Sequence, residues 1–195
     1  YYKTSNDVGV FGRISFLIFI VVLGIESARQ TVARLKKGRR MEELEQFALN
    51  DSMTGMYNRN AYDYFVKNER DFEGYVIVTF DLNNLKQCNH RVGDEYIINA
   101  AHIIEDNFER YGKCYRIGGD EFCCIIPKGR YFKIERVMHK IDQDVEILNH
   151  KNIIPVPVGI AYGYAVFTED DTDPEKVRER ADEDMYRNKK AMKQS

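Results

Sequence analysis

Residues 115–125 read Tyr-Arg-Ile-Gly-Gly-Asp-Glu-Phe-Cys-Cys-Ile. Strand-forming residues lie on both sides of a double glycine, and two adjacent acids follow the glycines. The pattern predicts a β-hairpin, with strands at 113–117 and 122–126, whose turn carries Asp120 and Glu121. Such a turn is either a solvated tip, since Gly-Asp is a common turn dipeptide, or a site built to hold a cation.

The segments around this hairpin alternate between helical and strand-like patterns. The predicted elements are a helix at 59–69, a strand at 75–80, a helix from Gly93, a helix at 130–149, a strand at 156–167 and a helix from Pro174. The order β-α-β-β-α-β, with one added helix at each end, predicts an α+β fold with a ferredoxin-like antiparallel sheet and helices on one face. In that fold the hairpin lies centrally, beside the strand that ends at Asp81.

Three carboxylates would meet at one edge of this sheet. Asp81 would lie near Asp120 and Glu121, and three such groups repel one another unless a cation lies between them. Hard divalent cations such as Mg²⁺ prefer carboxylate oxygens and keep positions open for phosphate. Gly118 and Gly119 would let the backbone approach a ligand closely. The turn is therefore predicted to carry metal, and the metal to carry phosphates.

Composition limits the remaining possibilities. The chain has 195 residues, a formal net charge of -2 and 44% hydrophobic residues, which predicts one globular domain with a smaller appendage. The near-neutral charge gives no argument for a nucleic-acid partner. The four cysteines show no Cys-x-x-Cys pair and are expected to be reduced thiols of a cytosolic domain. Because the sequence begins with Tyr1 rather than Met, we expect a fragment or a processed product.

The appendage is predicted from residues 14–25, a nearly unbroken apolar run. We interpret 1–25 as part of a membrane-spanning segment, although a buried core helix or the core of a signal peptide has the same composition. Six basic residues follow between Arg29 and Arg40, which places that side in the cytoplasm, at the inner membrane. Residues 26–49 are then a juxtamembrane helix that pairs with a second copy or serves as a solvated linker, and 50–195 form the globular domain.

The hairpin turn also belongs to a larger set of motifs. Gly118-Gly119-Asp120-Glu121-Phe122 resembles the signature of the GGDEF family, the bacterial diguanylate cyclases. Residues 51–59 are similar to the family's D-x-L-T-G-L-x-N-R, and residues 80–89 to its D-x-D-x-F-K-x-x-N. Gly93-Asp94 matches the GD that follows, and residues 181–186 together with Lys189 match the terminal A-D-x-A-L-Y-x-A-K. Five ordered motifs are far more specific than any single one.

The resemblance implies a palm-like nucleotidyl-cyclase sheet and roles for individual residues. Asp81, Asp120, Glu121 and the carbonyl of Leu82 would hold Mg²⁺ or Mn²⁺, two ions per active site. Glu121 could instead help deprotonate the attacking 3′-hydroxyl, and Lys86 would neutralise phosphate charge. The implied substrate contacts are Asn89 and Asp94 on the guanine edge, the backbone of Asn84 and Leu85 on the phosphates, Gly118 and Gly119 in the turn, and Lys189 and Lys193 as cations.

The implied reaction condenses two GTP into cyclic di-GMP and releases two pyrophosphates. Each domain would hold one GTP, so a homodimer is required, and a paired membrane helix and linker could set its geometry. A catalytically inactive GTP-binding or dimerisation module of a membrane sensor is the alternative. A class III cyclase that makes a cyclic monophosphate shares the two-metal chemistry but fits these motifs poorly.

The sequence departs from the family pattern in several places, among them His90, where an Asp is usual, and Lys193, where an Arg is usual. Asn83 stands where the second Asp of D-x-D is usual. The segment between Asn89 and Gly93 is shorter by roughly four residues, which affects the surroundings of both predicted guanine-binding residues. Residues 109–112 read Glu-Arg-Tyr-Gly, so the product-inhibition motif R-x-x-D is absent.

Overall fold

The computed structural model describes the backbone of residues 3–128 and 133–192, with side chains described for 12–36 and from 48 onward. The chain divides into two compact units, Tyr1–Gln46 and Phe47–Ser195. From the sequence we expect the globular domain to begin at residue 50, and that limit stays a prediction. How the first unit divides between membrane and linker stays a prediction.

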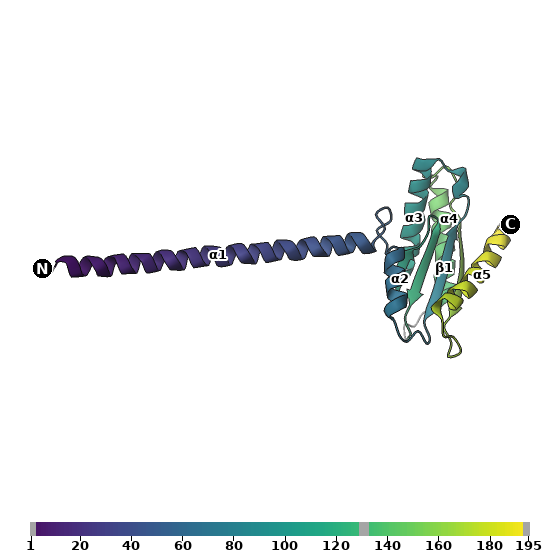
Figure 1. Cartoon of the computed structure of the whole chain (residues 1–195). Coiled ribbons are helices and arrows are strands. Elements are labelled where there is room, and N and C mark those ends of the chain that lie inside the picture. Colours follow the sequence, from purple (N-terminus) through teal and green to yellow (C-terminus); the bar gives the residue numbers. More distant parts are fainter. Residues whose placement is uncertain (1–2, 129–132, 193–195) are drawn as a thin grey trace. The chain divides into compact units, whose positions relative to one another are not determined.

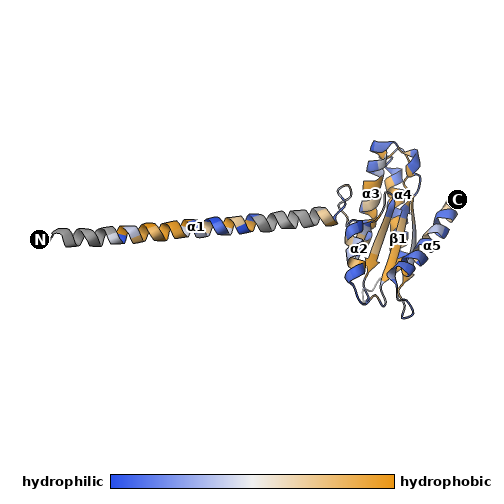
Figure 2. Cartoon of the chain, in the orientation of Figure 1, coloured by the Kyte–Doolittle hydropathy of each residue, from blue (hydrophilic) through white to orange (hydrophobic). Residues whose placement is uncertain are grey.

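The first unit consists of helix α1, Lys3–Leu49, whose last three residues belong to the second unit. The helix is continuous through Gly38. Its stretch Gly12–Lys36 is long and apolar enough to cross a membrane, with a mean hydropathy of 1.6 and its side chains exposed. Figure 2 shows this apolar stretch followed by polar turns. Length and composition alone support a membrane span here.

The second unit is built on one four-stranded sheet with the order β2-β3-β1-β4, in which all neighbours are antiparallel. The strands are β1 Val76–Leu82, β2 Lys113–Arg116, β3 Glu121–Ile126 and β4 Ile160–Val166. The helices are α2 Arg59–Asn68, η1 Leu85–Gln87, α3 His90–Phe108, α4 Ile134–His150 and α5 Pro174–Met192. This is the predicted ferredoxin-like order. Only half of the hairpin is central, however, because β2 forms an edge of the sheet.

Helices cover both faces of the sheet, whereas the sequence predicted one (Figure 1). The strands alternate, so Val78 and Phe80 of β1 pack with α3 and α4, while Ile77 packs with α2 and α5. The two helices that the sequence added at the ends of the core motif supply the second layer. Both faces of β1 are therefore buried, which explains its nearly continuous apolar sequence.

Two element boundaries differ from the sequence prediction for local reasons. Helix α3 begins at His90 rather than Gly93, because Asn89 caps it by accepting a hydrogen bond from the Val92 amide at 3.1 Å. Strand β4 begins at Ile160 rather than residue 156, since prolines at 155 and 157 cannot donate to a ladder. The predicted helix at 130–149 is observed from Ile134, and its residues 130–132 lie outside the described residues.

Helix α5 also seals the outer edge of β4. The amide of Tyr162 donates to Asn188 Oδ1 at 3.2 Å, and the amide of Tyr164 donates to Asp184 Oδ2 at 3.3 Å. Asp184 and Asn188 are one turn apart on α5. This distance is close to the spacing along a strand between two outward-facing amides that are two residues apart. Side chains of α5 thus satisfy backbone groups that a neighbouring strand would otherwise take.

Candidate functional site at the β1–β3 edge

The site lies where β1 ends beside the hairpin turn. Asp81 is the register partner of Glu121, and the Leu82 amide donates to the carbonyl of Asp120 at 3.0 Å. The strand order predicted this neighbourhood, because β1 and β3 pair directly. All four predicted metal-binding positions therefore come together through backbone pairing.

The acidic side chains at this edge have different surroundings. The Asp81 carboxylate forms an ion pair with Lys189 of α5, and their side chains are 15% and 24% exposed. Among the described residues, the Asp120 and Glu121 carboxylates have no hydrogen-bond or ion-pair partner. Gly118 makes room for Glu121, since a Cβ at Gly118 would lie 2.9 Å from Glu121 Oε2. Lys189 thus lies in direct contact with one of the predicted metal ligands.

The donor set fits a hard divalent cation in its chemistry. It offers carboxylate oxygens from Asp81, Asp120 and Glu121 and one carbonyl from Leu82, which are the ligands that Mg²⁺ prefers. In the described ranges, no three acidic, histidine or cysteine side chains lie close enough to enclose a metal ion. Because Asp81 is paired with Lys189, a metal ion bound by Asp81 would compete with the Lys189 ammonium for this carboxylate.

The loop after β1 holds the predicted phosphate contacts in a tight turn. Asn84 adopts a left-handed conformation with φ 61° at the N-cap of η1, and the Gln87 amide donates to the Asn84 carbonyl at 2.9 Å. Asparagine tolerates this conformation better than most residues. Leu85 packs against the core, whereas Lys86 is exposed. The loop therefore presents backbone groups and one lysine to solvent.

The predicted guanine contacts lie at the start of α3. Asn89 is the N-cap, and the exposed Asp94 follows in the next turn of the helix. No hydrogen bond joins these two side chains in the described part of the chain. The shortened segment is the first helical turn itself, with the Gly93 amide donating to the Asn89 carbonyl at 2.8 Å. Lys193 lies outside the described residues.

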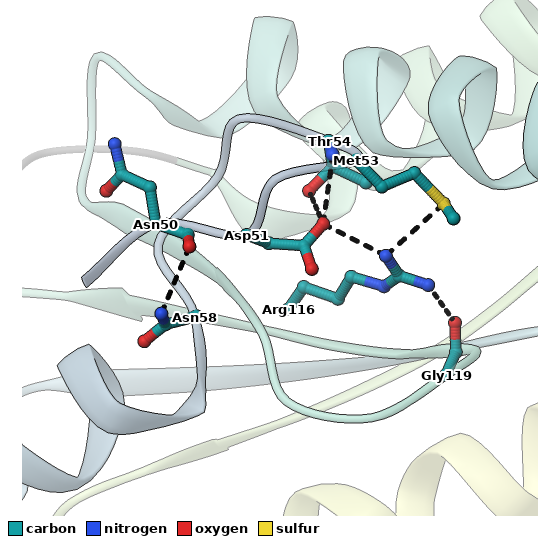
Figure 3. Close-up of polar contacts among 7 residues, drawn as sticks. All are labelled: Asn50, Asp51, Met53, Thr54, Asn58, Arg116 and Gly119. Carbon is teal, nitrogen blue, oxygen red and sulfur yellow. Dashed lines mark hydrogen bonds and ion pairs between the residues drawn. The ribbon is translucent and has the colours of Figure 1, made fainter. Parts of the chain in front are cut away.

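Sequence reasoning missed Arg116, which ties the hairpin turn to the start of the domain (Figure 3). Its guanidinium donates to the Gly119 carbonyl at 2.9 Å and to Asp51 Oδ1 at 2.9 Å. Thr54 donates to the same Asp51 oxygen through its amide at 2.9 Å and its hydroxyl at 2.8 Å. An arginine two residues before the double glycine, inside a strand, was the available signal.

These contacts change the acidity of Asp51. Burial by itself would raise its pKa, but the hydrogen bonds from Arg116 and Thr54 outweigh burial and lower the pKa below 3.8. Asp51 is therefore ionised at neutral pH. The side chains of Arg116 and Asp51 are only 11% and 24% exposed, so solvent screens this pair weakly. The turn that carries Asp120 is thus held by a largely buried charged contact.

Comparison with known proteins agrees with this geometry. The family model "Diguanylate cyclase, GGDEF domain" matches residues 48–195. MucR of Pseudomonas aeruginosa, a bifunctional diguanylate cyclase/cyclic di-GMP phosphodiesterase, is 30% identical over 147 residues, covering 69% of this chain and 22% of MucR. The diguanylate cyclase DgcS of Shewanella oneidensis is 28% identical over 158 residues, covering 76% of this chain and 52% of DgcS. The chain belongs to the GGDEF family.

Solved structures give the same fold. The coiled coil and GGDEF domain of DgcB from Caulobacter crescentus, in complex with c-di-GMP, superimposes with a TM-score of 0.71 at 22% identity, over 87% of this chain and 95% of that one. The diguanylate cyclase SiaD of Pseudomonas aeruginosa, in complex with its activator SiaC, gives 0.63 at 21% identity, over 97% and 79%. At this identity the likeness establishes the fold. The chain spans about half or less of the length of the curated relatives it matches.

Proposed function

We propose that this domain is a diguanylate cyclase, which condenses two GTP into cyclic di-GMP with release of pyrophosphate. The observation that carries the proposal is the pairing of β1 with β3. It sets Asp81 and Leu82 directly beside Asp120 and Glu121, at the end of β1 where the phosphate loop begins. The match of residues 48–195 to the family supports the same reading.

The chain's own residues divide the work by their chemistry. Asp81, Asp120, Glu121 and the Leu82 carbonyl would hold Mg²⁺ or Mn²⁺, which when bound would favour ionisation of the attacking 3′-hydroxyl and stabilise the leaving phosphate. The backbone at Asn84 and Leu85 would orient the β- and γ-phosphates. The cations of the site are Lys86, Lys189 and Lys193, and the residues for the guanine edge are Asn89 and Asp94.

Lys189 has a second part in this proposal. In the free domain it neutralises Asp81. When GTP and metal enter, the ammonium can move from the carboxylate to the phosphates, since both are anionic oxygen acceptors. Lys189 would therefore keep the site electrically balanced both with and without substrate.

A complete active site requires two copies of the domain, because each holds one GTP and supplies half of the reacting atoms. We propose a homodimer anchored to the inner membrane through α1, with the catalytic domain in the cytoplasm. The apolar stretch Gly12–Lys36 and the basic residues toward its C-terminal end support the anchor and its orientation.

One observation favours a second candidate, an inactive nucleotide-binding or dimerisation module. The segment between Asn89 and Gly93, which lies between the predicted guanine-binding residues, is shorter than the family pattern by roughly four residues. Such a module would bind GTP without turnover. The two candidates differ in product formation, so an activity measurement separates them.

The test uses the full chain in lipid nanodiscs, incubated with GTP and Mg²⁺ and analysed for cyclic di-GMP by chromatography and mass spectrometry. Asp120→Asn should abolish product, because the amide removes a charged metal ligand while keeping its shape. Asp170→Asn is the matched control, an exposed acid outside the site, and should be as active as the parent. Turnover by Asp120→Asn at the parental rate would refute the proposed site, and GTP binding without product in the parent would establish the inactive module.

A further inference from the structure

Tyr96 lies in α3 with its ring in the core and its hydroxyl under the loop that follows β1. The side chain is fully buried, at 0% exposure. The hydroxyl donates to the Asn83 carbonyl at 2.6 Å and accepts a hydrogen bond from the Gly159 amide at 2.7 Å. One phenol therefore bridges two segments, the beginning of the phosphate loop and the residue before β4.

The bridge reinforces a direct backbone contact. The Asn83 amide donates to the Gly159 carbonyl at 2.8 Å, so a main-chain hydrogen bond and the two that pass through Tyr96 hold Asn83 beside Gly159. Gly159 permits the close approach, since a Cβ there would lie 3.2 Å from the Asn83 Cβ. The carbonyl of Pro157 is a more distant acceptor for the hydroxyl, at 3.3 Å.

The hydroxyl is suited to a double role because it stays protonated. Burial raises the pKa of Tyr96 to about 12, although the bond from Gly159 acts in the opposite direction. A neutral phenol can donate one hydrogen bond and accept another at the same time. Phenylalanine would fill the same space and would leave the Asn83 carbonyl and the Gly159 amide without these partners.

We propose that Tyr96 is a positioning residue, which fixes the conformation of the phosphate loop at 84–86 by holding the residue before it, Asn83. Asn83 immediately precedes Asn84, whose left-handed conformation turns the backbone toward Leu85 and Lys86. Fixing the Asn83 carbonyl fixes the peptide plane from which this turn starts. The consequence for GTP affinity rests on the proposed function, whereas the anchoring of the loop does not.

The test compares Tyr96→Phe with Tyr62→Phe in the full chain in nanodiscs. Tyr62 is the matched control, since it is 1% exposed and its hydroxyl has a contact with Glu175 at 3.4 Å, in the other core cluster. Hydrogen exchange followed by mass spectrometry measures the exchange rate of backbone amides in the peptides that contain residues 83–88 and 159. Loss of two buried hydrogen bonds should speed exchange in these peptides about tenfold in Tyr96→Phe, and Tyr62→Phe should leave them unchanged.

GTP binding in the presence of Mg²⁺ provides the second measurement. We expect Kd to rise about tenfold in Tyr96→Phe and to stay parental in Tyr62→Phe, which separates loop positioning from a general loss of core stability. Parental exchange in Tyr96→Phe, or equal effects of both substitutions, would overturn the anchoring. Faster exchange with a parental Kd would overturn the role in GTP binding. A parent that binds no GTP would refute the proposed function, and the exchange measurement would still decide the anchoring.

Discussion

Arg116 links two sequence motifs that lie far apart in the chain. Its contact with Asp51 spans 65 positions, and its contact with Gly119 reaches the turn of the hairpin. A charged side chain that is mostly buried is stable only when it is paired and hydrogen-bonded. The Asp51 motif therefore contributes to the site indirectly, by fixing the arginine that holds the turn.

Asp51→Asn should lower the free energy of unfolding by about 1–3 kcal/mol at pH 7, because Arg116 loses its charged partner. The pKa of Asp51 is lowered in the folded domain, so the unfolded chain binds the proton first as pH falls. The Asp51 carboxylate makes its full contribution to stability at pH values well above 3.8. That contribution disappears as the pH falls through the pKa of Asp51 in the folded domain. Urea unfolding of both proteins from pH 7 to pH 3 measures the difference.

The control is Asp63→Asn, at an acid whose side chain is 58% exposed and paired with Arg59 on the surface of α2. Its effect should be within about 0.5 kcal/mol of zero at every pH. A gap between Asp51→Asn and the parent that persists undiminished at pH 3 would contradict the charge-based account.

Residues of the site differ in how far they can be predicted from sequence. The proximity of Asp81 to Asp120 follows from strand order, which hydrophobic alternation and the glycine-rich turn indicate locally. The partners of Arg116 and Tyr96 could not be predicted, because they depend on the distance between segments after folding. The contact of Lys189 with Asp81 belongs to the same class, since it joins residues 108 positions apart.

At the scale of elements, the contact between α5 and β4 is unusually close at one point. A Cβ at Gly163 would lie 2.0 Å from the Met185 amide nitrogen and 2.4 Å from the Ala181 carbonyl oxygen. Both are backbone atoms, so neither can move without displacing the helix. Gly163 therefore sets the separation of α5 from the sheet, and with it the position of Lys189 beside Asp81.

Gly163→Ala should destabilise the domain by about 1–3 kcal/mol or more, because the added methyl overpacks a backbone contact. Gly119→Ala is the matched control for stability, since a Cβ at Gly119 meets nothing within 4 Å. Thermal unfolding followed by circular dichroism measures both. Equal melting temperatures for Gly163→Ala and the parent would show that α5 can shift away from β4 at little cost.

The helices and strands themselves were largely predictable, and the errors have physical causes. Helix α3 starts earlier because Asn89 acts as a cap, and the prolines near 157 delay β4. The second helical layer was not predicted, because the pattern of a strand buried on both faces does not say which helices cover it. Tertiary packing decided that question.

At the scale of the whole molecule, the apolar stretch of α1 and the globular second unit suit different solvents, lipid and water. Its apolar side chains are exposed within the chain, for example Phe16 at 63% and Leu17 at 62%, while the second unit has its own buried core. Exposed apolar area of this extent is expected to be covered by lipid or by another helix. The membrane is the covering that best suits a helix apolar on all sides.

Replacing both Ile20 and Val21 by arginine should abolish membrane association, because each arginine near the centre of a span costs about 2.5–3.5 kcal/mol. Flotation of the full chain with phospholipid vesicles measures the bound fraction. Leu35→Arg is the control near the end of the stretch, where the side chain can reach the interface, and should float like the parent. Flotation of the double variant at the parental level would contradict a membrane span.

The seal that α5 forms along β4 also has a consequence during protein synthesis. Strand β4 leaves the ribosome before α5. During that interval the amides of Tyr162 and Tyr164 lack their hydrogen-bond acceptors, the side chains of Asn188 and Asp184. An open strand edge can pair with another nascent chain on the same polysome. Slow translation across 167–188, or a stop codon within this range, would therefore favour co-translational aggregation. The edge of β4 is protected from pairing with other chains only after α5 has docked.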